Sequence, residues 1–299
     1  MRRFSAAYNT EGSSYTIYAD MQIITTKKGL AEVSAASRAA NKSIGLVPTM
    51  GALHAGHASL IRRSVEENDT TFVSVFVNPT QFNNKEDLLH YPRTMERDSE
   101  LLRSLHVDYL FAPAPEEMYT PEELNSTFQF DFAGLDKVME GKMRPGHFNG
   151  VVQIVSRLFD LVKPTRAYFG EKDFQQLAII RHLVKQMHYD IEIVGCPIVR
   201  EESGLALSSR NERLSEAEKA TAVSISKILF ASKELTRNHS VKEVEDWVIS
   251  HINAIEGLTV EYYEIVDEDT LQPARDFSHA VGCVTVYCGQ VRLIDNIHY

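Results

Sequence analysis

The residues most able to do chemistry lie in segment 47–57, where two histidines stand three positions apart and two glycines accompany them. An apolar run that ends at Pro48 predicts a buried strand, and the pattern after His57 predicts a helix. His54 and His57 would then face the same way at one helix N-terminus. Because that position favours negative charge, we interpret the segment as a phosphate-handling site. A zinc site is the alternative, although no third ligand follows at a recognisable spacing.

A second polar cluster, Gly170-Glu171-Lys172-Asp173, follows the short apolar run 167–169. Glycine allows backbone to approach a ligand closely, and Lys172 supplies a point charge for phosphate. Glu171 or Asp173 could hold Mg²⁺, which prefers carboxylate and phosphate oxygens. The alternative is a solvated turn in which Asp173 caps the next helix.

A third cluster, Leu207-Ser208-Ser209-Arg210-Asn211, lies near the end of the first predicted domain. Small hydroxyl side chains followed by an arginine suit a mobile loop that closes on a triphosphate. A capping loop before the helix near Ser215 is equally consistent with the sequence. We interpret a fourth segment, 144–148, as a structural turn that leads into a helix.

The elements that must position these residues alternate between strand and helix from residue 21 to about 200. This alternation predicts an α/β fold with a Rossmann-like, doubly wound parallel sheet. Because ligands of such sheets bind beyond the carboxyl ends of the strands, we expect 47–57 and 78–81 to share one crevice. The predicted strands are 44–47, 72–77, 108–112, 167–169 and 190–199, and the predicted helices are 58–65, 93–105, 150–161 and 174–187.

After Gly204 the predicted elements no longer alternate between strand and helix. Helical patterns cover 215–235 and 241–255, and strand patterns cover 258–266, 281–287 and 291–294. We therefore predict three parts: an N-terminal extension over 1–20, a Rossmann-like domain over 21–200 that holds the predicted phosphate site, and a smaller α+β C-terminal domain over 201–299 that closes over the site.

The composition narrows the class of protein. The 299 residues carry a formal net charge of −10, which argues against non-specific electrostatic binding to nucleic acid or to an anionic membrane. No apolar run approaches the roughly 20 residues of a membrane span, and the first twenty residues lack the apolar core of a signal peptide. Three scattered cysteines suit free thiols, so we expect a cytoplasmic protein. Neither a Gly-x-Ser-x-Gly motif nor a P-loop is present.

Six segments, taken in order, resemble the motif series of the pantothenate synthetase family. The resemblance runs from about Met21 to the C-terminal segment Arg292–Asn296. The segment His54-Ala55-Gly56-His57 matches the HxGH signature of the nucleotidylyltransferase superfamily. The 20-residue extension is the one clear departure. The six segments are 47–57, 76–82, 91–94, 144–150, 170–176 and 207–211.

The resemblance implies an ATP-dependent ligation of pantoate and β-alanine to pantothenate. In that family, pantoate is first activated as pantoyl adenylate with release of pyrophosphate, and the amine of β-alanine then displaces AMP. The resemblance also implies Mg²⁺ with the ATP, and a homodimer. Positioning and charge stabilisation, rather than covalent catalysis, would be the task of the protein.

The resemblance also assigns residues. It implies catalytic roles for His57, His54, Lys172 and Arg210, and we interpret His57 as a hydrogen-bond donor that stabilises charge. Gln81 would bind pantoate and β-alanine, Gln176 would bind pantoate, and Asp173 is the candidate near Mg²⁺. The ATP-binding residues would be Met50, Gly51, Ala52, Leu53, His54, Ala55, Gly56, His57, Gly170, Glu171, Lys172, Asp173, Val199, Leu207, Ser208, Ser209 and Arg210.

Two other functions compete with this one. An adenylyltransferase of the same superfamily would retain AMP in its product, whereas the ligase releases AMP once an amine is supplied. A nucleotide-sensing protein would bind ATP without releasing pyrophosphate.

Overall fold

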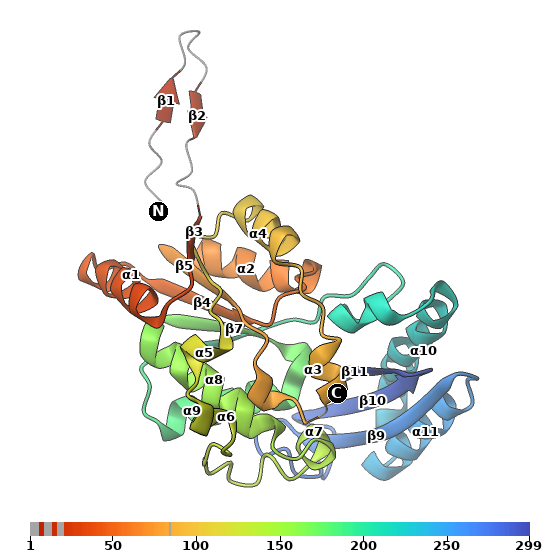
Figure 1. The fold of residues 1–299 in the computed structure, drawn as a ribbon. Coiled ribbons are helices and arrows are strands. Elements are labelled where there is room, and N and C mark those ends of the chain that lie inside the picture. Colours follow the sequence, from red (N-terminus) through yellow and green to blue (C-terminus); the bar gives the residue numbers. More distant parts are fainter. Residues whose placement is uncertain (1–5, 9–13, 17–20, 84) are drawn as a thin grey trace.

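The structure is a computed structural model, and it describes residues 6–8, 14–16, 21–83 and 85–299 (Figure 1). Within the first twenty residues it describes two short paired strands, β1 (Ala6–Tyr8) and β2 (Ser14–Thr16). The rest of the predicted N-terminal extension lies outside the described residues.

A six-stranded sheet with only parallel pairs forms the centre of the first unit, as predicted. Its spatial order is β3-β6-β5-β4-β7-β8, so the chain adds strands first on one side of β4 and then on the other. The switch point of this doubly wound sheet therefore lies between β4 and β7, where ligands of such folds bind. The strands are β3 (Gln22–Ile24), β4 (Ile44–Thr49), β5 (Thr70–Val75), β6 (Tyr109–Phe111), β7 (Arg166–Gly170) and β8 (Glu192–Cys196).

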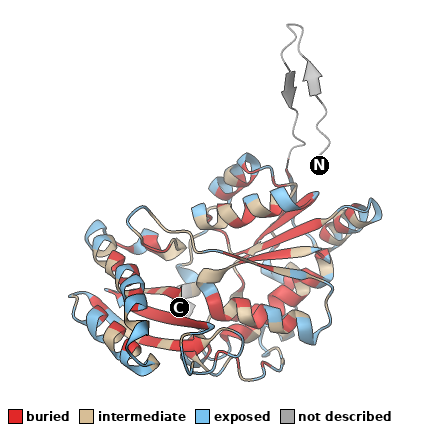
Figure 2. Ribbon diagram, turned by 180° about the vertical axis from the view of Figure 1, so that it is seen from behind, coloured by how far each residue is buried: buried red, intermediate tan, exposed pale blue. Residues whose placement is uncertain are grey.

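Helices cover both faces of the sheet. In Figure 1, α2 (Ala55–Glu67) and α4 (Met95–Ser104) lie above it, whereas α8 (His147–Val162) and α9 (Phe174–Gln186) lie below. Helix α1 (Lys27–Ala39), at the left, packs against α8. Each face has its own apolar core, and every residue of β5 is buried. Figure 2 shows the strands red between helices whose outer faces are pale blue.

The second unit is a three-stranded antiparallel sheet packed on two helices. Its order is β11-β10-β9, and α10 (Glu216–Ser232) and α11 (Val241–Asn253) share a separate core with it. This arrangement is the predicted smaller α+β unit. The strands are β9 (Leu258–Asp267), β10 (Ala280–Cys288) and β11 (Val291–His298), and the 3₁₀ turn η4 (Lys233–Arg237) follows α10.

Helix α1 was not predicted, and its sequence explains why. Its buried face consists of Leu30, Ser34 and Ser37, so two of its three inward positions are polar and the apolar period is missing. Thr26 nevertheless caps the helix by accepting a hydrogen bond from the amide of Gly29 at 3.1 Å. The irregular segment 113–145 contains three short helices, α5 (Pro115–Met118), α6 (Pro121–Leu124) and α7 (Met139–Met143). A further short helix, α3 (Lys85–Leu89), precedes α4.

Candidate active site

The turn between β4 and α2 is held by a buried carboxylate. Gly51 and Ala52 adopt positive φ angles of 81° and 50°. Asp98, on α4 and 1% exposed, accepts the amides of Ala52 at 2.9 Å and Leu53 at 2.8 Å. These two amides are therefore committed to the carboxylate, and the path of the turn is fixed before α2 begins. Asp98 is not predictable from the sequence, because no motif or spacing near residue 98 marks it.

The two histidines form a reciprocal cap at the start of α2. The amide of Gly56 donates to Nδ1 of His54 at 3.1 Å, and the amide of His54 donates to Nδ1 of His57 at 3.4 Å. A Cβ on residue 56 would lie 2.8 Å from Cε1 of His54, so only glycine allows the ring to lie there. We call His54, Gly56 and His57 the histidine corner.

This cap determines what the two rings can do. Because Nδ1 of each ring accepts a backbone N–H, the neutral form of each must carry its proton on Nε2. Burial, with Lys172 as the next cause, lowers the pKa of His54 to about 4. Burial, followed by the neighbouring His54, lowers the pKa of His57 to about 3. Both rings are therefore neutral at physiological pH and offer one N–H donor each.

A cavity of about 190 Å³ opens beside the histidine corner, at the switch point of the sheet. Its lining comes from five parts of the chain, within 48–60, at 91, and within 168–176, 197–199 and 207–210. The loop 207–210 reaches the turn directly, because Ser209 Oγ donates to the carbonyl of Ala52 at 3.1 Å. The amide of Leu207 bonds the carbonyl of Val199 at 3.0 Å, which fixes the base of that loop. The polar side chains in the lining include His54, His57, Lys172, Ser208, Ser209 and Arg210.

The 3₁₀ turn η2 (Glu171–Asp173) presents Lys172 and Asp173 to this cavity. Asp173 occupies the N-cap position of α9 but makes no capping hydrogen bond, and its carboxylate lies 3.4 Å from Nζ of Lys172. Asn296, from the second unit, donates to the carbonyls of Glu171 at 2.8 Å and Lys172 at 3.1 Å. Asp173 therefore stands at the expected N-cap position without capping the helix through its side chain, and Asn296 of β11 holds the turn in place.

The described residues contain no group of three or more His, Cys, Asp or Glu side chains that could hold a metal ion. Asp173, whose side chain is 49% exposed at the cavity, remains the available carboxylate. A single carboxylate suits Mg²⁺ that arrives with phosphate oxygens, because this ion uses one or two protein carboxylates together with the substrate.

A second chamber of about 170 Å³ adjoins the first and shares Met50, His57 and Gln176 with it. Residues of 47–57 and 78–81 line it together, as expected of the shared crevice. Polar residues, among them Gln81 and Gln176, make up about half of its lining, and the other half is apolar. Gln81 is 8% exposed and ends the turn η1 (Pro79–Gln81). Its Nε2 contacts Sδ of Met50 at 3.2 Å.

Gly150 and Asn78 position Gln81. A Cβ on residue 150 would lie 2.4 Å from the carbonyl of Thr80, so glycine lets η1 pack directly on α8. Asn78 donates to Oε1 of Gln81 at 3.1 Å and to the carbonyl of Gly150 at 3.0 Å. The orientation of the Gln81 amide is thereby fixed.

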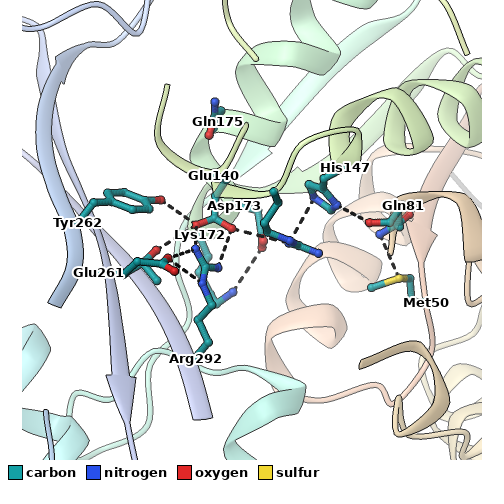
Figure 3. Close-up of polar contacts among 12 residues, drawn as sticks. Met50, Gln81, Glu140, His147, Lys172, Asp173, Gln175, Glu261, Tyr262 and Arg292 are labelled. Atoms are coloured by element: carbon teal, nitrogen blue, oxygen red, sulfur yellow. Dashed lines mark hydrogen bonds and ion pairs between the residues drawn. The ribbon is translucent and has the colours of Figure 1, made fainter. Parts of the chain in front are cut away.

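The segment 144–148 is more than the structural turn that we predicted. Gly146, with φ 82°, does lead into α8, but the side chains of Arg144 and His147 line a small cavity between the two units. Nδ1 of His147 lies 2.8 Å from the carbonyl of Gln81 (Figure 3). Burial, with Arg144 as the next cause, lowers the pKa of His147 to about 4, so this ring is also neutral.

A largely buried ion pair crosses between the units beside this turn. Arg292 of β11 donates to both carboxylate oxygens of Glu140, at 2.6 and 2.7 Å (Figure 3). Burial opposes ionisation of Glu140, but the hydrogen bonds and charge of Arg292 outweigh it and lower the pKa to about 2. This pair is not predictable from the sequence, because its members are far apart in the chain and neither lies in a recognisable spacing.

Not every predicted ATP-binding residue reaches the cavity. Met50, His54, Gly56, His57, Gly170, Lys172, Asp173, Val199 and the four residues 207–210 line it. Gly51, Ala52 and Leu53 build the turn beneath it, and Ala55 and Glu171 are likewise not among the lining residues. Gln81 and Gln176 line the second chamber, and Arg210 lines both the main and the interdomain cavity.

Comparison with known proteins gives a consistent result. A sequence model of the Pantoate-beta-alanine ligase family matches residues 22–298. The pantothenate synthetase of Bacteroides fragilis strain YCH46 is 60% identical over 282 residues, which cover 93% of this chain and 99% of that protein. The corresponding protein of Bacteroides thetaiotaomicron is 59% identical over the same length.

Solved structures agree with the sequence comparison. The crystal structure of pantothenate synthetase from Thermus thermophilus is 43% identical, with a TM-score of 0.85, and covers 93% of this chain and 99% of that one. The pantoate-beta-alanine ligase from Francisella tularensis, described as complexed with beta-gamma ATP and beta-alanine, is 36% identical with a TM-score of 0.77. It covers 93% of this chain and 97% of its own.

Proposed function

The chain belongs to the Pantoate-beta-alanine ligase family, whose reaction joins pantoate to β-alanine with consumption of ATP, and we propose that the two adjoining cavities carry out both steps of that reaction. In the first step a carboxylate oxygen of pantoate attacks the α-phosphorus of ATP, and pyrophosphate leaves. In the second step the amine of β-alanine attacks the activated carbonyl, loses a proton, and AMP leaves with the former carboxylate oxygen. Activation is required because an unmodified carboxylate has a poor leaving group.

The histidine corner is the main reason to place the triphosphate of ATP in the first cavity. His54 and His57 each offer an Nε2–H donor at a helix N-terminus, and Lys172 supplies a positive charge in the lining of the same cavity. Neutral donors fixed by the backbone need little reorganisation as charge develops on the departing pyrophosphate. His57 thus acts as a charge-stabilising donor and not as an acid that gives up its proton.

The adjoining chamber suits pantoate. Pantoate has two hydroxyls and two methyl groups, and this chamber combines the amides of Gln81 and Gln176 with apolar side chains from α8. Amides both donate and accept, which matches hydroxyl groups. Because His57 lines both chambers, a carboxylate held in one can reach a phosphate held in the other. We assign the β-alanine amine to the same meeting point, near Gln81.

Magnesium fits the site through Asp173. When bound with ATP, this ion would supply charge neutralisation on the phosphate oxygens. Asp173 would hold it, while Lys172 and Arg210 hold other phosphate oxygens and keep the triphosphate oriented.

Assembly and location remain proposals as well. The family resemblance supports a homodimer, which sedimentation of the purified chain tests. No helix in the described part of the chain is long and apolar enough to cross a membrane. Three free, buried cysteines, Cys196, Cys283 and Cys288, support a reducing compartment such as the cytoplasm.

A stepwise assay tests the function. Purified protein with ATP, Mg²⁺ and pantoate should release pyrophosphate, and AMP should appear only after β-alanine is added. AMP retained in the product would instead indicate an adenylyltransferase. Tight ATP binding without any pyrophosphate would indicate a nucleotide sensor.

A further inference from the structure

One carboxylate of the first unit receives a hydrogen bond from every strand of the second. Oε1 of Glu140, on α7, accepts from Tyr262 of β9 at 2.8 Å and from Thr285 of β10 at 3.0 Å. Arg292 of β11 binds both oxygens in a fork. Tyr262 and Thr285 are direct cross-strand partners, so these donors share one face of the sheet. Such convergence on a single group indicates a built joint rather than an incidental contact.

A β-bulge completes the joint. The pairing of β9 with β10 shifts between Thr285 and Val286, which leaves Glu261 as the extra residue without a partner. The carboxylate of Glu261 accepts from Nε of Arg292 at 2.9 Å and from its Nη2 at 2.5 Å. Arg292, with a side chain only 20% exposed, is thus held between two carboxylates. We call Glu140, Glu261, Tyr262, Thr285 and Arg292 the carboxylate joint.

The other oxygen of Glu140 faces the turn 144–148 of its own unit. Its Oε2 lies 3.7 Å from Nη1 of Arg144, and the same nitrogen lies 3.4 Å from Nε2 of His147. An arginine can only donate, so Nε2 of His147 accepts and Nδ1 carries the proton. That proton is donated to the carbonyl of Gln81 at 2.8 Å. A continuous set of polar contacts therefore runs from the second unit to the predicted pantoate-binding residue (Figure 3).

Because Glu140 is largely buried, the position of the second unit affects the turn that carries Arg144 and His147. The Glu140 side chain is 13% exposed, and a buried carboxylate is costly unless its partners are in place. Its main partners come from the second unit, so the turn that carries Arg144 and His147 is fully supported only when β9–β11 are docked. Residues 140 to 147 are the segment through which docking reaches Gln81.

We propose that Glu140 is a positioning residue for the first reaction step, which couples docking of the C-terminal sheet to the geometry of the pantoate chamber through Arg144 and His147. This inference rests on the proposed function, because it takes Gln81 as a pantoate ligand. Glu140 itself touches neither the main cavity nor the second chamber among their lining residues.

The variant Glu140→Gln tests the coupling while keeping the size of the side chain. The KM for pantoate should rise about tenfold, the scale of one lost charge-assisted hydrogen bond, whereas the KM for ATP should stay within about twofold. Arg292→Gln should raise the pantoate KM to the same extent. The double variant should raise it no further than either single variant, because each of the three variants breaks the same ion pair. Equal changes in both KM values, or additive effects, would contradict the proposal.

The matched control is Glu123→Gln. Glu123 forms a similar fork with Arg157, at 2.6 and 3.3 Å, but both residues belong to the first unit. This variant should leave the pantoate KM unchanged. If it raised that KM as much as Glu140→Gln, loss of any partly buried ion pair would explain the result and the coupling would be refuted.

Hydrogen exchange separates this inference from the proposed function. Amides of η1 and of the first turn of α8 should exchange faster in Glu140→Gln than in the parent chain, whether or not the protein turns over. Unchanged exchange there would overturn the coupling even in an active enzyme. Absence of pantoate-dependent pyrophosphate release from the parent chain would instead overturn the function and leave the exchange result standing.

Discussion

The histidine corner and the carboxylate joint both lie next to Lys172 and Asp173, yet they handle charge in opposite ways. The corner is local: the rings of His54 and His57 accept backbone amides of their own helix turn, and both rings stay neutral. The joint is assembled from distant parts of the chain and stays ionised, because Arg292 lowers the pKa of Glu140 to about 2.

This difference separates two tasks of an enzyme that activates a carboxylate. Donors for a departing pyrophosphate must be ready in the free protein, and a cap within one helix turn provides that. Alignment of two substrates must respond to the position of the second unit, and an ion pair across the units provides that. We therefore expect variants of the corner to act on the chemical step, and variants of the joint to act on pantoate binding.

The largest expected effect comes from His57→Ala. Pyrophosphate release should slow by roughly 10²–10³, the usual scale for one preorganised donor. The KM for pantoate should change much less, in contrast to Glu140→Gln. The exposed His239, which lines neither cavity of the site, provides the control variant His239→Ala. Near-normal turnover of His57→Ala would refute the assigned role of the corner.

Gln81 lies between the two regions, and Gln81→Ala should raise the pantoate KM by about 10–100-fold, as expected for lost buried hydrogen bonds. ATP binding, measured by calorimetry, should remain intact. Gln129→Ala, at an exposed glutamine of the same unit, is the control. An equal loss of ATP affinity would mean that Gln81 serves the triphosphate and that the chambers are assigned in the wrong order.

Acid pH should distinguish the neutral corner from the ionised joint. The pKa values of His54 and His57 are lowered in the folded chain, so below pH 6.5 the unfolded chain binds more protons. The free energy of unfolding should fall as pH falls from 6.5 towards about 4, by up to about 1.4 kcal/mol per pH unit for each such histidine. Glu140, with its pKa lowered to about 2 in the folded chain, contributes to this pH dependence only below about pH 5.5, where the same carboxyl begins to take up a proton in the unfolded chain.

Urea unfolding across this range checks the prediction. Between pH 6.5 and about 5.5, His57→Asn should show a shallower decline than the parent chain, because one proton-binding site of the unfolded chain has been removed. Glu140→Gln should show the parental slope in that interval, because a glutamate of the unfolded chain is still ionised there. A parental slope in His57→Asn would contradict the neutral state of that ring.

The smallest expected effect is that of Ser209→Ala, which removes the contact between the loop 207–210 and the carbonyl of Ala52. Loss of one such hydrogen bond corresponds to about 2–10-fold weaker ATP binding. Ser224→Ala, on α10, is a control of the same chemistry. A change in pantoate KM without any change in ATP affinity would show that the loop belongs functionally to the joint.

Residues that are close in sequence made much of this protein predictable. The alternation of strands and helices predicted a doubly wound sheet, because buried parallel strands are continuous apolar runs. The histidine corner was predictable because all its members lie within one turn, and the crevice was predictable because 47–57 and 78–81 follow adjacent strands. The sequence also carried the family resemblance, since its motifs occur in order.

Only the tertiary structure decided which distant residues hold these motifs in place. Asp98 is 46 residues from the amide of Ala52, Asn296 is 125 from the carbonyl of Glu171, and Arg292 is 152 from Glu140. Single acidic, amide or basic residues carry no periodic signal, so the sequence does not distinguish them from the many solvated ones. Their partners become defined only when the sheet and the second unit have docked, because burial then makes each unpaired charge or amide costly.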